Sequence, residues 1–264
     1  MFAGGKEEIF PAFPIMRNLK LVIEYDGTNY HGWQRQDRQV TIQEILEEKI
    51  GVFTREAVTV IGSGRTDAGV HALRQVAHVK INAEIDCGLF RYGVNAILPR
   101  DIVIREASDV SLSFHARFDV ISKKYRYQIW NNPIPTALYR RYFWHIPHFL
   151  DVERMREGAE FLLGTHDFRS FCGTGSKVKD YVRTIHHLAV EKEGMEKIFI
   201  TVTADGFMRH MVRNIVGTLV DVGKGKQIPQ DVHDIRDACD RKRAGMTAPA
   251  QGLFLVDVCY NPPG

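Results

Sequence analysis

The sequence predicts an α+β protein built from two similar halves with antiparallel sheets. Short β-branched runs alternate with amphipathic segments whose apolar residues recur at helical spacing. The order β-α-β-β-α-β can be followed twice along the chain, without obvious sequence identity between the two copies. The 264 residues, of which 44% are hydrophobic and 25% charged, have the composition of a folded globular protein.

The first copy begins with a β-branched, partly alternating run at residues 19–25, which the turn signal Asp26-Gly27 ends. A helix is predicted at 41–52, because Thr41 suits the N-cap and Glu44 occupies the capping-box position. The remaining predicted elements of this copy are a strand at 57–61, a strand at 75–81, a helix at 87–97 and a strand at 102–105.

The second copy repeats this order with a strand at 124–130, a helix at 151–163, strands at 184–192 and 196–203, a helix at 207–222 and a strand at 253–259. Each copy is a split βαβ (ferredoxin-like) unit, in which helices cover one side of an antiparallel sheet. We expect the two sheets to join and a cleft between the halves to hold the functional site. The expected division is an N-terminal extension at 1–17, a first half at 18–115 and a second half at 116–261.

Four longer segments, rich in Gly, Arg and Thr, separate the predicted elements and lie at 26–40, 62–74, 164–183 and 223–252. Loops on a rigid scaffold are where binding and catalytic residues usually lie. We therefore look for the chemistry of this chain in these segments.

Several classes of protein are disfavoured by composition. The formal net charge of +3 is too small to indicate a polyanionic partner by itself, although it permits one. The four cysteines lie far apart without a C-x-x-C pair, which disfavours a zinc knuckle or a disulfide framework and fits a cytoplasmic protein. Residues 1–16 resemble neither a secretory signal nor a membrane span. The closest histidine pairs lack zinc-like partners, so we expect no metal.

The segment 62–69 presents a single carboxylate in a glycine-rich loop. Its glycines permit tight turns that hold Asp67 beside an arginine, and Arg65 or Arg213 can supply that positive charge. An ordinary turn and a phosphate-cradling loop are the alternatives, although the G-x-x-x-x-G-K-[ST] pattern of a P-loop is absent.

Basic and aromatic residues are interleaved in the predicted strand at 124–130. Alternation puts Tyr125 and Tyr127 on one face and Lys124 and Arg126 on the other. By this pattern alone both tyrosines are core residues. The basic pair is a candidate for contact with a nucleic-acid backbone, with a solvated surface as the alternative.

The motif Gly64-Arg65-Thr66-Asp67-Ala68-Gly69-Val70-His71 resembles the signature of the TruA family of tRNA pseudouridine synthases. A second block at residues 24–36 resembles the same family, and the resemblance covers about residues 18–260. Within this block we expect Arg35 to contact an RNA backbone, the alternative being a hairpin loop that only packs.

The resemblance implies a role for each of five residues. Asp67 is implied as the nucleophile, and Tyr125 as the ring that stacks on the target uracil. Arg213, within a Met-Val-Arg-Asn block, is implied to pair with Asp67 from the second half. Leu253 is expected against the pocket wall, and Arg65 is expected to bind the substrate.

The function that the resemblance implies is isomerisation of uridine to pseudouridine on the 3′ side of the anticodon stem-loop of tRNA, by a homodimer. No cofactor is expected, because the reaction exchanges no electrons overall. Attack on uracil C6, attack on ribose C1′ and removal of a ribose proton all put Asp67 beside the same nucleoside. A non-catalytic RNA-binding protein is the alternative function, and a phosphoryl-transfer enzyme is a weaker one because no lysine-containing phosphate loop is present.

Overall fold

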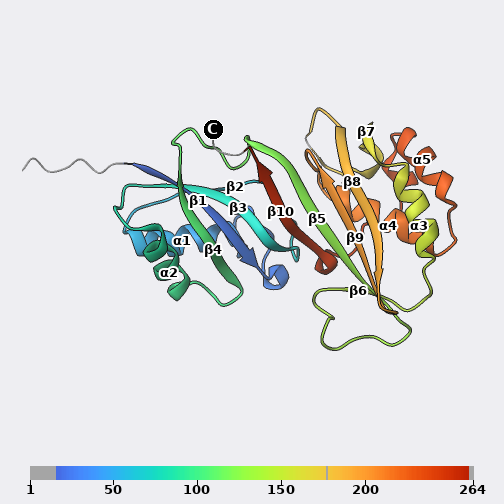
Figure 1. Cartoon of the computed structure of the whole chain (residues 1–264), viewed down its shortest axis with the longest axis horizontal. Helices are drawn as coiled ribbons and strands as arrows, with labels where there is room; N and C mark the ends of the chain where they lie inside the picture. Colours follow the sequence, from blue (N-terminus) through green and yellow to red (C-terminus); the bar gives the residue numbers. More distant parts are fainter. Residues whose placement is uncertain (1–15, 177, 262–264) are drawn as a thin grey trace, which may run out of the picture.

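A ten-stranded sheet runs through the computed structural model, which describes residues 16–176 and 178–261 (Figure 1). Eight of its strands follow one another in space in the order β4 (Ile102–Val110), β1 (Arg17–Tyr25), β3 (His71–Ile81), β10 (Leu253–Tyr260), β5 (Val120–Asn131), β9 (Lys197–Ala204), β8 (Val182–Glu193) and β7 (Gly164–Asp167). The other two are short: β2 (Val60–Gly62) pairs with β3, and β6 (Trp144–Ile146) pairs with β5. The sheet is mostly antiparallel, but β10 runs parallel to β3. The fold is therefore mixed α+β with one large sheet.

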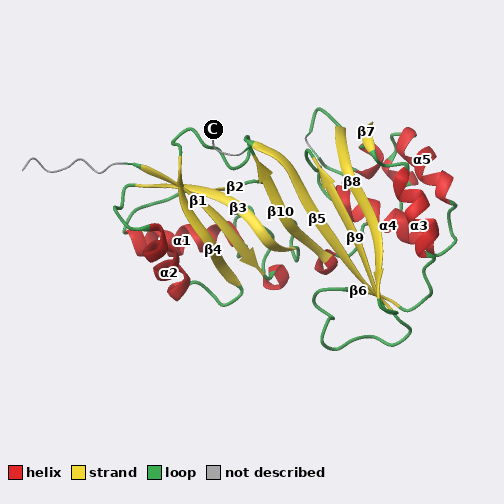
Figure 2. Ribbon diagram, viewed as in Figure 1, coloured by secondary structure: helices red, strands yellow, loops and turns green. Residues whose placement is uncertain are grey.

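The α-helices of the described residues pack on this sheet in two groups, one in each half (Figure 2). They are α1 (Ile42–Thr54), α2 (Cys87–Ile97), α3 (Val152–Glu160), α4 (Met211–Gly223) and α5 (Pro229–Asp237). Side chains of Thr41, Asp86 and Asp151 accept hydrogen bonds from backbone N–H groups of the first turns of α1, α2 and α3. α4 is buried along nearly its whole length, between α3 and the sheet.

One face of the sheet carries the hydrophobic core. A row of buried cross-strand partners crosses β1, β3, β10, β5, β9 and β8 on this face, namely Tyr25, Ala72, Leu255, Tyr125, Val202 and Leu188. Cross-strand partners point to the same side of a sheet. We call this side the helix face, since the helices pack on it, and the opposite side the open face.

The two halves repeat one strand order. The first half has the order β4-β1-β3-β2 and the second has β10-β5-β9-β8. The outer edge of β3 is shared between two strands, because β2 pairs with residues 77–79 and β10 pairs with His71 and Ala72. β10 thus joins the halves, and the segment 63–70 leaves the sheet beside this joint.

The elements predicted for both copies are present, but several bounds differ. β2 is limited to three residues, and β3 begins at His71, inside a predicted loop. α4 begins at Met211 because His210 before it has a left-handed backbone (φ 59°). Arg17, assigned above to the N-terminal extension, is the first residue of β1, while residues 1–15 of that extension lie outside the described residues.

The prediction of a loop over the whole of 223–252 is wrong, because this segment contains α5. Pro229 stands at the start of the helix, and the Asp231 side chain accepts a hydrogen bond from the Ile228 N–H. Val232 and Ile235, at i and i+3, are the buried residues of this helix. β6 and β7 are also additions to the prediction, and both are short.

Three further findings concern the chemical class of the chain. The four cysteines are all free. None of the helices within 16–176 and 178–261 has the length and apolar character needed to cross a membrane. The same ranges contain no cluster of three or more His, Cys, Asp or Glu side chains arranged to hold a metal ion.

Candidate active site

The loop that carries Asp67 is held at its base by polar contacts with β3. The Ser63 N–H donates to the Val76 carbonyl over 2.7 Å, and the Ser63 hydroxyl donates to Gln75 Oε1 over 2.7 Å. The amide of Gln75 in turn donates to the Gly64 carbonyl over 3.0 Å. Gln75 and Ser63 are fully buried, so this base is fixed away from water.

A second loop, at residues 26–33, supports the Asp67 loop from its other side. Backbone hydrogen bonds join Trp33 N–H to Thr66 C=O (3.1 Å) and Gly69 N–H to Tyr30 C=O (3.3 Å). Gly32 is required here for two reasons, because its φ is +87° and a Cβ would lie 2.5 Å from the Thr66 carbonyl oxygen. The two motif blocks noted in the sequence are therefore packed against each other.

An ion pair links the Asp67 loop to α4 of the second half. Arg213 Nη1 donates to Asp67 Oδ2 over 3.0 Å, and Arg213 Nε donates to the Ala248 carbonyl over 2.7 Å. The side chain of Arg213 is 15% exposed and that of Asp67 is 31% exposed. The hydrogen bond and the ion pairs found for the Asp67 carboxylate within the described ranges all involve Oδ2, which leaves Oδ1 without such a partner there.

His210 is a neighbour of Asp67 that the sequence analysis missed. Its Nε2 lies 3.6 Å from Asp67 Oδ2, and its left-handed backbone conformation places it immediately before α4. Burial lowers the pKa of His210, which favours the neutral imidazole. The available signal was its position three residues before Arg213, which puts both side chains near one end of the same helix.

Tyr125 lies on the helix face of β5 and is 7% exposed. Its ring packs edge-on against Phe207, with 5.0 Å between the ring centroids. Burial raises the pKa of the Tyr125 phenol, and the nearby charge of Asp67 adds to this effect. The phenol is therefore protonated at neutral pH and lies near the carboxylate.

Leu253 lies on the same face of the sheet, one cross-strand pair away from Tyr125. It is 5% exposed and pairs with Tyr127, whose hydroxyl donates to the Pro249 carbonyl over 2.8 Å. The direct cross-strand partner of Tyr125 is Leu255. Leu253 is thus part of the apolar surroundings of Tyr125 and Tyr127.

The four remaining basic candidates lie apart from the Asp67 ion pair. Arg65 is exposed and donates from Nε to Gln34 Oε1 over 3.1 Å. Arg35 is also exposed, with Nη1 3.4 Å from a carboxylate oxygen of Glu47 on α1. Lys124 and Arg126 are on the open face of β5, where Arg126 lies 5.6 Å from the centroid of the Phe199 ring. Of the arginines considered for Asp67, the one that forms the ion pair is Arg213.

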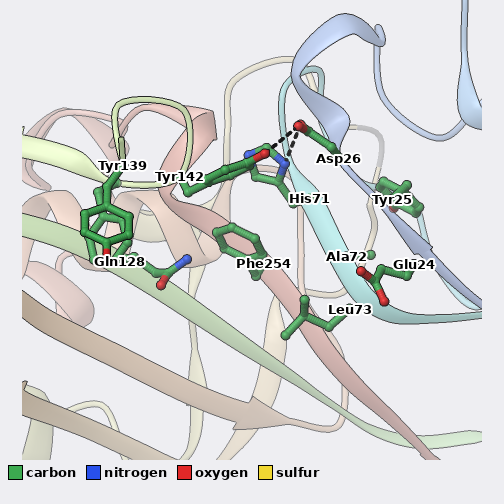
Figure 3. A pocket seen from close by; sticks show the side chains of 11 residues that line it. Glu24, Tyr25, Asp26, His71, Ala72, Leu73, Gln128, Tyr139, Tyr142 and Phe254 are labelled. Atoms are coloured by element: carbon green, nitrogen blue, oxygen red, sulfur yellow. Dashed lines mark hydrogen bonds and ion pairs between the residues drawn. The ribbon is translucent and has the colours of Figure 1, made fainter. Parts of the chain in front are cut away.

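A second polar group lies on the open face, in a hollow of about 360 Å³ (Figure 3). There the Tyr142 hydroxyl donates to Asp26 Oδ2 over 2.8 Å, and His71 Nδ1 lies 3.1 Å from Asp26 Oδ1. The His71 ring stacks on Phe254 with 4.6 Å between centroids. His71 follows the Asp67 loop directly, so this group anchors the end of the loop from the side opposite Tyr125.

The arrangement around Asp67 suits nucleophilic chemistry on an uncharged ring. The Arg213 guanidinium fixes one oxygen of the Asp67 carboxylate, and the other oxygen is available. The phenol of Tyr125, which is protonated and uncharged, lies nearby. A carboxylate positioned in this way can attack an electron-poor carbon or remove a proton, and the aromatic ring can hold a flat substrate.

Comparison with known proteins identifies the family. A family model described as tRNA pseudouridine synthase matches residues 21–119 and 159–261. The chain is 49% identical over 246 residues to tRNA pseudouridine synthase A of Acetivibrio thermocellus, covering 93% of this chain and all of that protein. It is 47% identical to the proteins of the same name from Thermoanaerobacter sp. and Brevibacillus brevis, with 93% of this chain and all of each relative covered. On this match, and with the motif residues in the positions described above, the chain belongs to the TruA family of tRNA pseudouridine synthases.

Proposed function

We propose that this chain isomerises uridine to pseudouridine in tRNA, with Asp67 as the nucleophile. The observation that carries the proposal is the Asp67 carboxylate, held by Arg213 through one oxygen and open to a substrate through the other. A salt bridge of this kind fixes the orientation of the carboxylate toward the substrate.

The reaction breaks the N1–C1′ glycosidic bond, turns the uracil and joins its C5 to C1′. The proton displaced from C5 is balanced by a proton gained at N1, so no electrons are exchanged overall. The enzyme must therefore supply a nucleophile, a pocket that retains the detached base and a group that accepts the C5 proton. No cofactor enters this scheme.

In this proposal Tyr125 stacks on the uracil and Leu253 closes the apolar side of the pocket. Their position on the helix face and the nearness of Tyr125 to Asp67 support these roles. Asp67 attacks uracil C6 or ribose C1′, or removes a ribose proton, and all three routes require the same position beside the nucleoside.

The proposed substrate is a uridine on the 3′ side of the anticodon stem-loop. The nucleotide must leave its stack to reach Asp67, which costs a few kcal/mol and least near the end of a stem. Arg65 and Arg35 are proposed to contact the RNA backbone around it, and their exposure supports this role. Lys124 and Arg126 point to the open face, away from Tyr125, so any contact that they make with tRNA is proposed for a part of the RNA remote from this uridine. A tRNA substrate implies a cytoplasmic reaction.

We include homodimerisation in the proposal, with the open face as the contact surface. Large apolar side chains are exposed at the hollow of Figure 3, namely Leu73 on β3 and Tyr139 in the segment between β5 and β6. Leu138, next to Tyr139 in the chain, is also exposed. Contiguous exposed apolar surface of this kind is typical of protein–protein contact. Sedimentation analysis of the chain and of a Leu138→Glu variant is expected to give a dimer and a weakened dimer, and a monomer in both cases would contradict it.

The function is tested by tritium release from tRNA that carries tritium at uridine C5. We expect release that needs neither ATP nor a divalent metal, measured with and without ATP and with a chelator. RNA binding without release would favour the non-catalytic alternative. Release that depends on ATP would favour phosphoryl transfer.

A further inference from the structure

Lys123 is a basic residue of the helix face that has no role in the scheme above. It lies on β5 two residues before Tyr125, so both side chains point to the same side of the sheet. The side chain is partly buried, in contrast to its neighbour Lys124, which is exposed on the open face. Two consecutive lysines therefore face different surroundings, and Lys123 is the one on the side of Asp67.

Gly64 provides the space that the Lys123 ammonium occupies. A Cβ built on Gly64 would lie 2.6 Å from Lys123 Nζ, closer than a real Cβ contact. The backbone of Gly64 does not have the positive φ that would by itself call for glycine. The glycine leaves room for the end of the lysine side chain, and Lys123 Nζ lies against the first residues of the Asp67 loop.

The surroundings of Lys123 contain positive charge and no matching carboxylate. Within the described ranges, no ion pair and no hydrogen bond of its ammonium are found. Burial, and to a smaller extent the charge of Arg117, lowers the pKa of Lys123 to about 8. At neutral pH most of the molecules still carry the ammonium, so Lys123 keeps its charge without an ion-pair partner among the described residues.

The segment that carries Arg117 is itself fixed beside the Asp67 loop. The Tyr260 hydroxyl donates to the Ala116 carbonyl over 2.6 Å, and the Ala116 N–H donates to Nδ1 of the buried His78 over 3.1 Å. Ser63, at the base of the loop, is a neighbour of the Tyr260 hydroxyl and lowers the pKa of this phenol, which burial raises. Arg117 follows Ala116 directly, so these contacts fix its backbone, while its side chain is exposed.

We propose that Lys123 and Arg117 form an anion site that binds one phosphate of the substrate RNA, next to the uridine that enters the pocket. The inference rests on the proposed function and adds a phosphate site to it. An unpaired, partly desolvated ammonium binds an anion more strongly than an exposed one, because less water must be displaced. A nucleotide that leaves its stack carries its own phosphates to the mouth of the pocket, where this site would hold them.

The first experiment compares Lys123→Met with Lys192→Met, which removes the same charge from an exposed position on β8. For an anticodon stem-loop RNA, we expect Lys123→Met to raise KM about tenfold to a hundredfold, with kcat changed much less. The dependence of log KM on log salt should flatten by about 0.7 to 0.9, the value for one lost phosphate contact. Lys192→Met should keep the KM, the kcat and the salt dependence of the unmodified protein.

The second experiment replaces single phosphates of the stem-loop with uncharged methylphosphonates. One replacement next to the target uridine should raise the KM of the unmodified protein and leave that of Lys123→Met unchanged, because the contact is already absent. Gly64→Ala, which displaces the ammonium but keeps its charge, should show a smaller increase in KM than Lys123→Met.

The outcomes separate this site from the proposed function. If the unmodified protein converts no uridine, the proposed function fails. If it converts uridine and Lys123→Met retains its KM and salt dependence, the anion site is rejected. A fall in kcat alone, with KM and salt dependence unchanged, would also reject the phosphate site, since it would tie Lys123 to the chemical step.

Discussion

β2 and β8 occupy equivalent places in the two halves but differ fourfold in length. β8 spans 12 residues and pairs with β9 along most of its length, whereas β2 has three residues. The connections that follow differ in the same way. β8 and β9 are joined by a tight turn at Gly194, while β2 and β3 are joined by the segment 63–70, which carries Asp67.

The difference shows how a repeated fold acquires a single site. Because β2 ends early, His71 and Ala72 on the edge of β3 are free to pair with β10. β10 belongs to the second half, so this pairing brings α4 and Arg213 beside the Asp67 loop. The shortening of one strand thus provides both the joint between the halves and the loop that carries Asp67, the proposed nucleophile.

The largest effect on activity is expected from replacing Asp67, in the connection between β2 and β3. Asp67→Asn is expected to lower the rate of pseudouridine formation at least about a thousandfold, because the amide is a poor nucleophile of nearly the same shape. Binding of tRNA should persist, as measured by filter binding. Glu193→Gln, in the exposed ion pair with Lys197 near the short connection, is the control and should retain activity. Full turnover by Asp67→Asn would show that the connection between β2 and β3 does not supply the nucleophile.

The next largest effect is expected from replacing Arg213, which the second half contributes to the site. Arg213→Ala is expected to lower kcat about a hundredfold, because Asp67 loses the charge that fixes one of its oxygens. Arg213→Lys should recover part of the loss, since it restores the charge without the second hydrogen bond to Ala248. Single-turnover rates measure both changes, with Arg243→Ala at an exposed position as the control. Equal rates for Arg213→Ala and the unmodified protein would show that the reaction does not need Arg213 of the second half.

Two replacements of Tyr125 separate the ring from its hydroxyl. Tyr125→Ala is expected to lower kcat/KM about tenfold to a hundredfold, because a base stacked on an aromatic ring is stabilised by about 1–3 kcal/mol. Tyr125→Phe keeps the ring and should lose less, and any loss in kcat would assign the hydroxyl to proton transfer. Steady-state kinetics on one stem-loop RNA distinguish the variants. Equal activity of all three proteins would exclude Tyr125 from the pocket.

The smallest effect compares a glycine in each of the two connections. Gly69 and Gly194 both have positive φ, so an alanine should cost about 1–2 kcal/mol of unfolding free energy at either position. A Cβ at Gly69 would also lie 3.3 Å from Ala250 of the second half, whereas at Gly194 nothing lies within 4 Å. Urea unfolding should therefore show similar losses, but only Gly69→Ala should lose activity. A matching loss of activity in Gly194→Ala would mean that the two connections are not functionally distinct.

The repeated order of strands and helices could be predicted from the sequence, because each element has a clear hydrophobic period and clear end signals. Alternation along β5 also separated Tyr125 and Tyr127 from Lys124 and Arg126, as the structure has them. The resemblance to a known family indicated which arginine belongs beside Asp67, a choice that the residues alone left open. These features depend on local pattern or on motifs that stand close together.

The features that the sequence did not reveal depend on competition between distant segments. Residues 57–61 have the composition of a complete strand, but only Val60–Gly62 pairs, while another part of the β3 edge pairs with β10. Nothing local marks His210 or Lys123 as neighbours of the Asp67 loop, since each is placed by the packing of a different element. α5 was missed because its short apolar repeat lies in a segment whose overall composition is that of a loop.

The position of β10 in the chain order has a consequence for biosynthesis. β10 follows every other element in sequence, yet it is the strand between β3 and β5 that makes the sheet continuous. During translation the first half can form its own strands early, since domains fold as units from the N-terminal side. The edge of β3 at His71 and Ala72 then cannot pair with β10 until residues 253–260 have been synthesised. A polypeptide interrupted before this point would therefore have Asp67 in its loop but no completed enzyme around it.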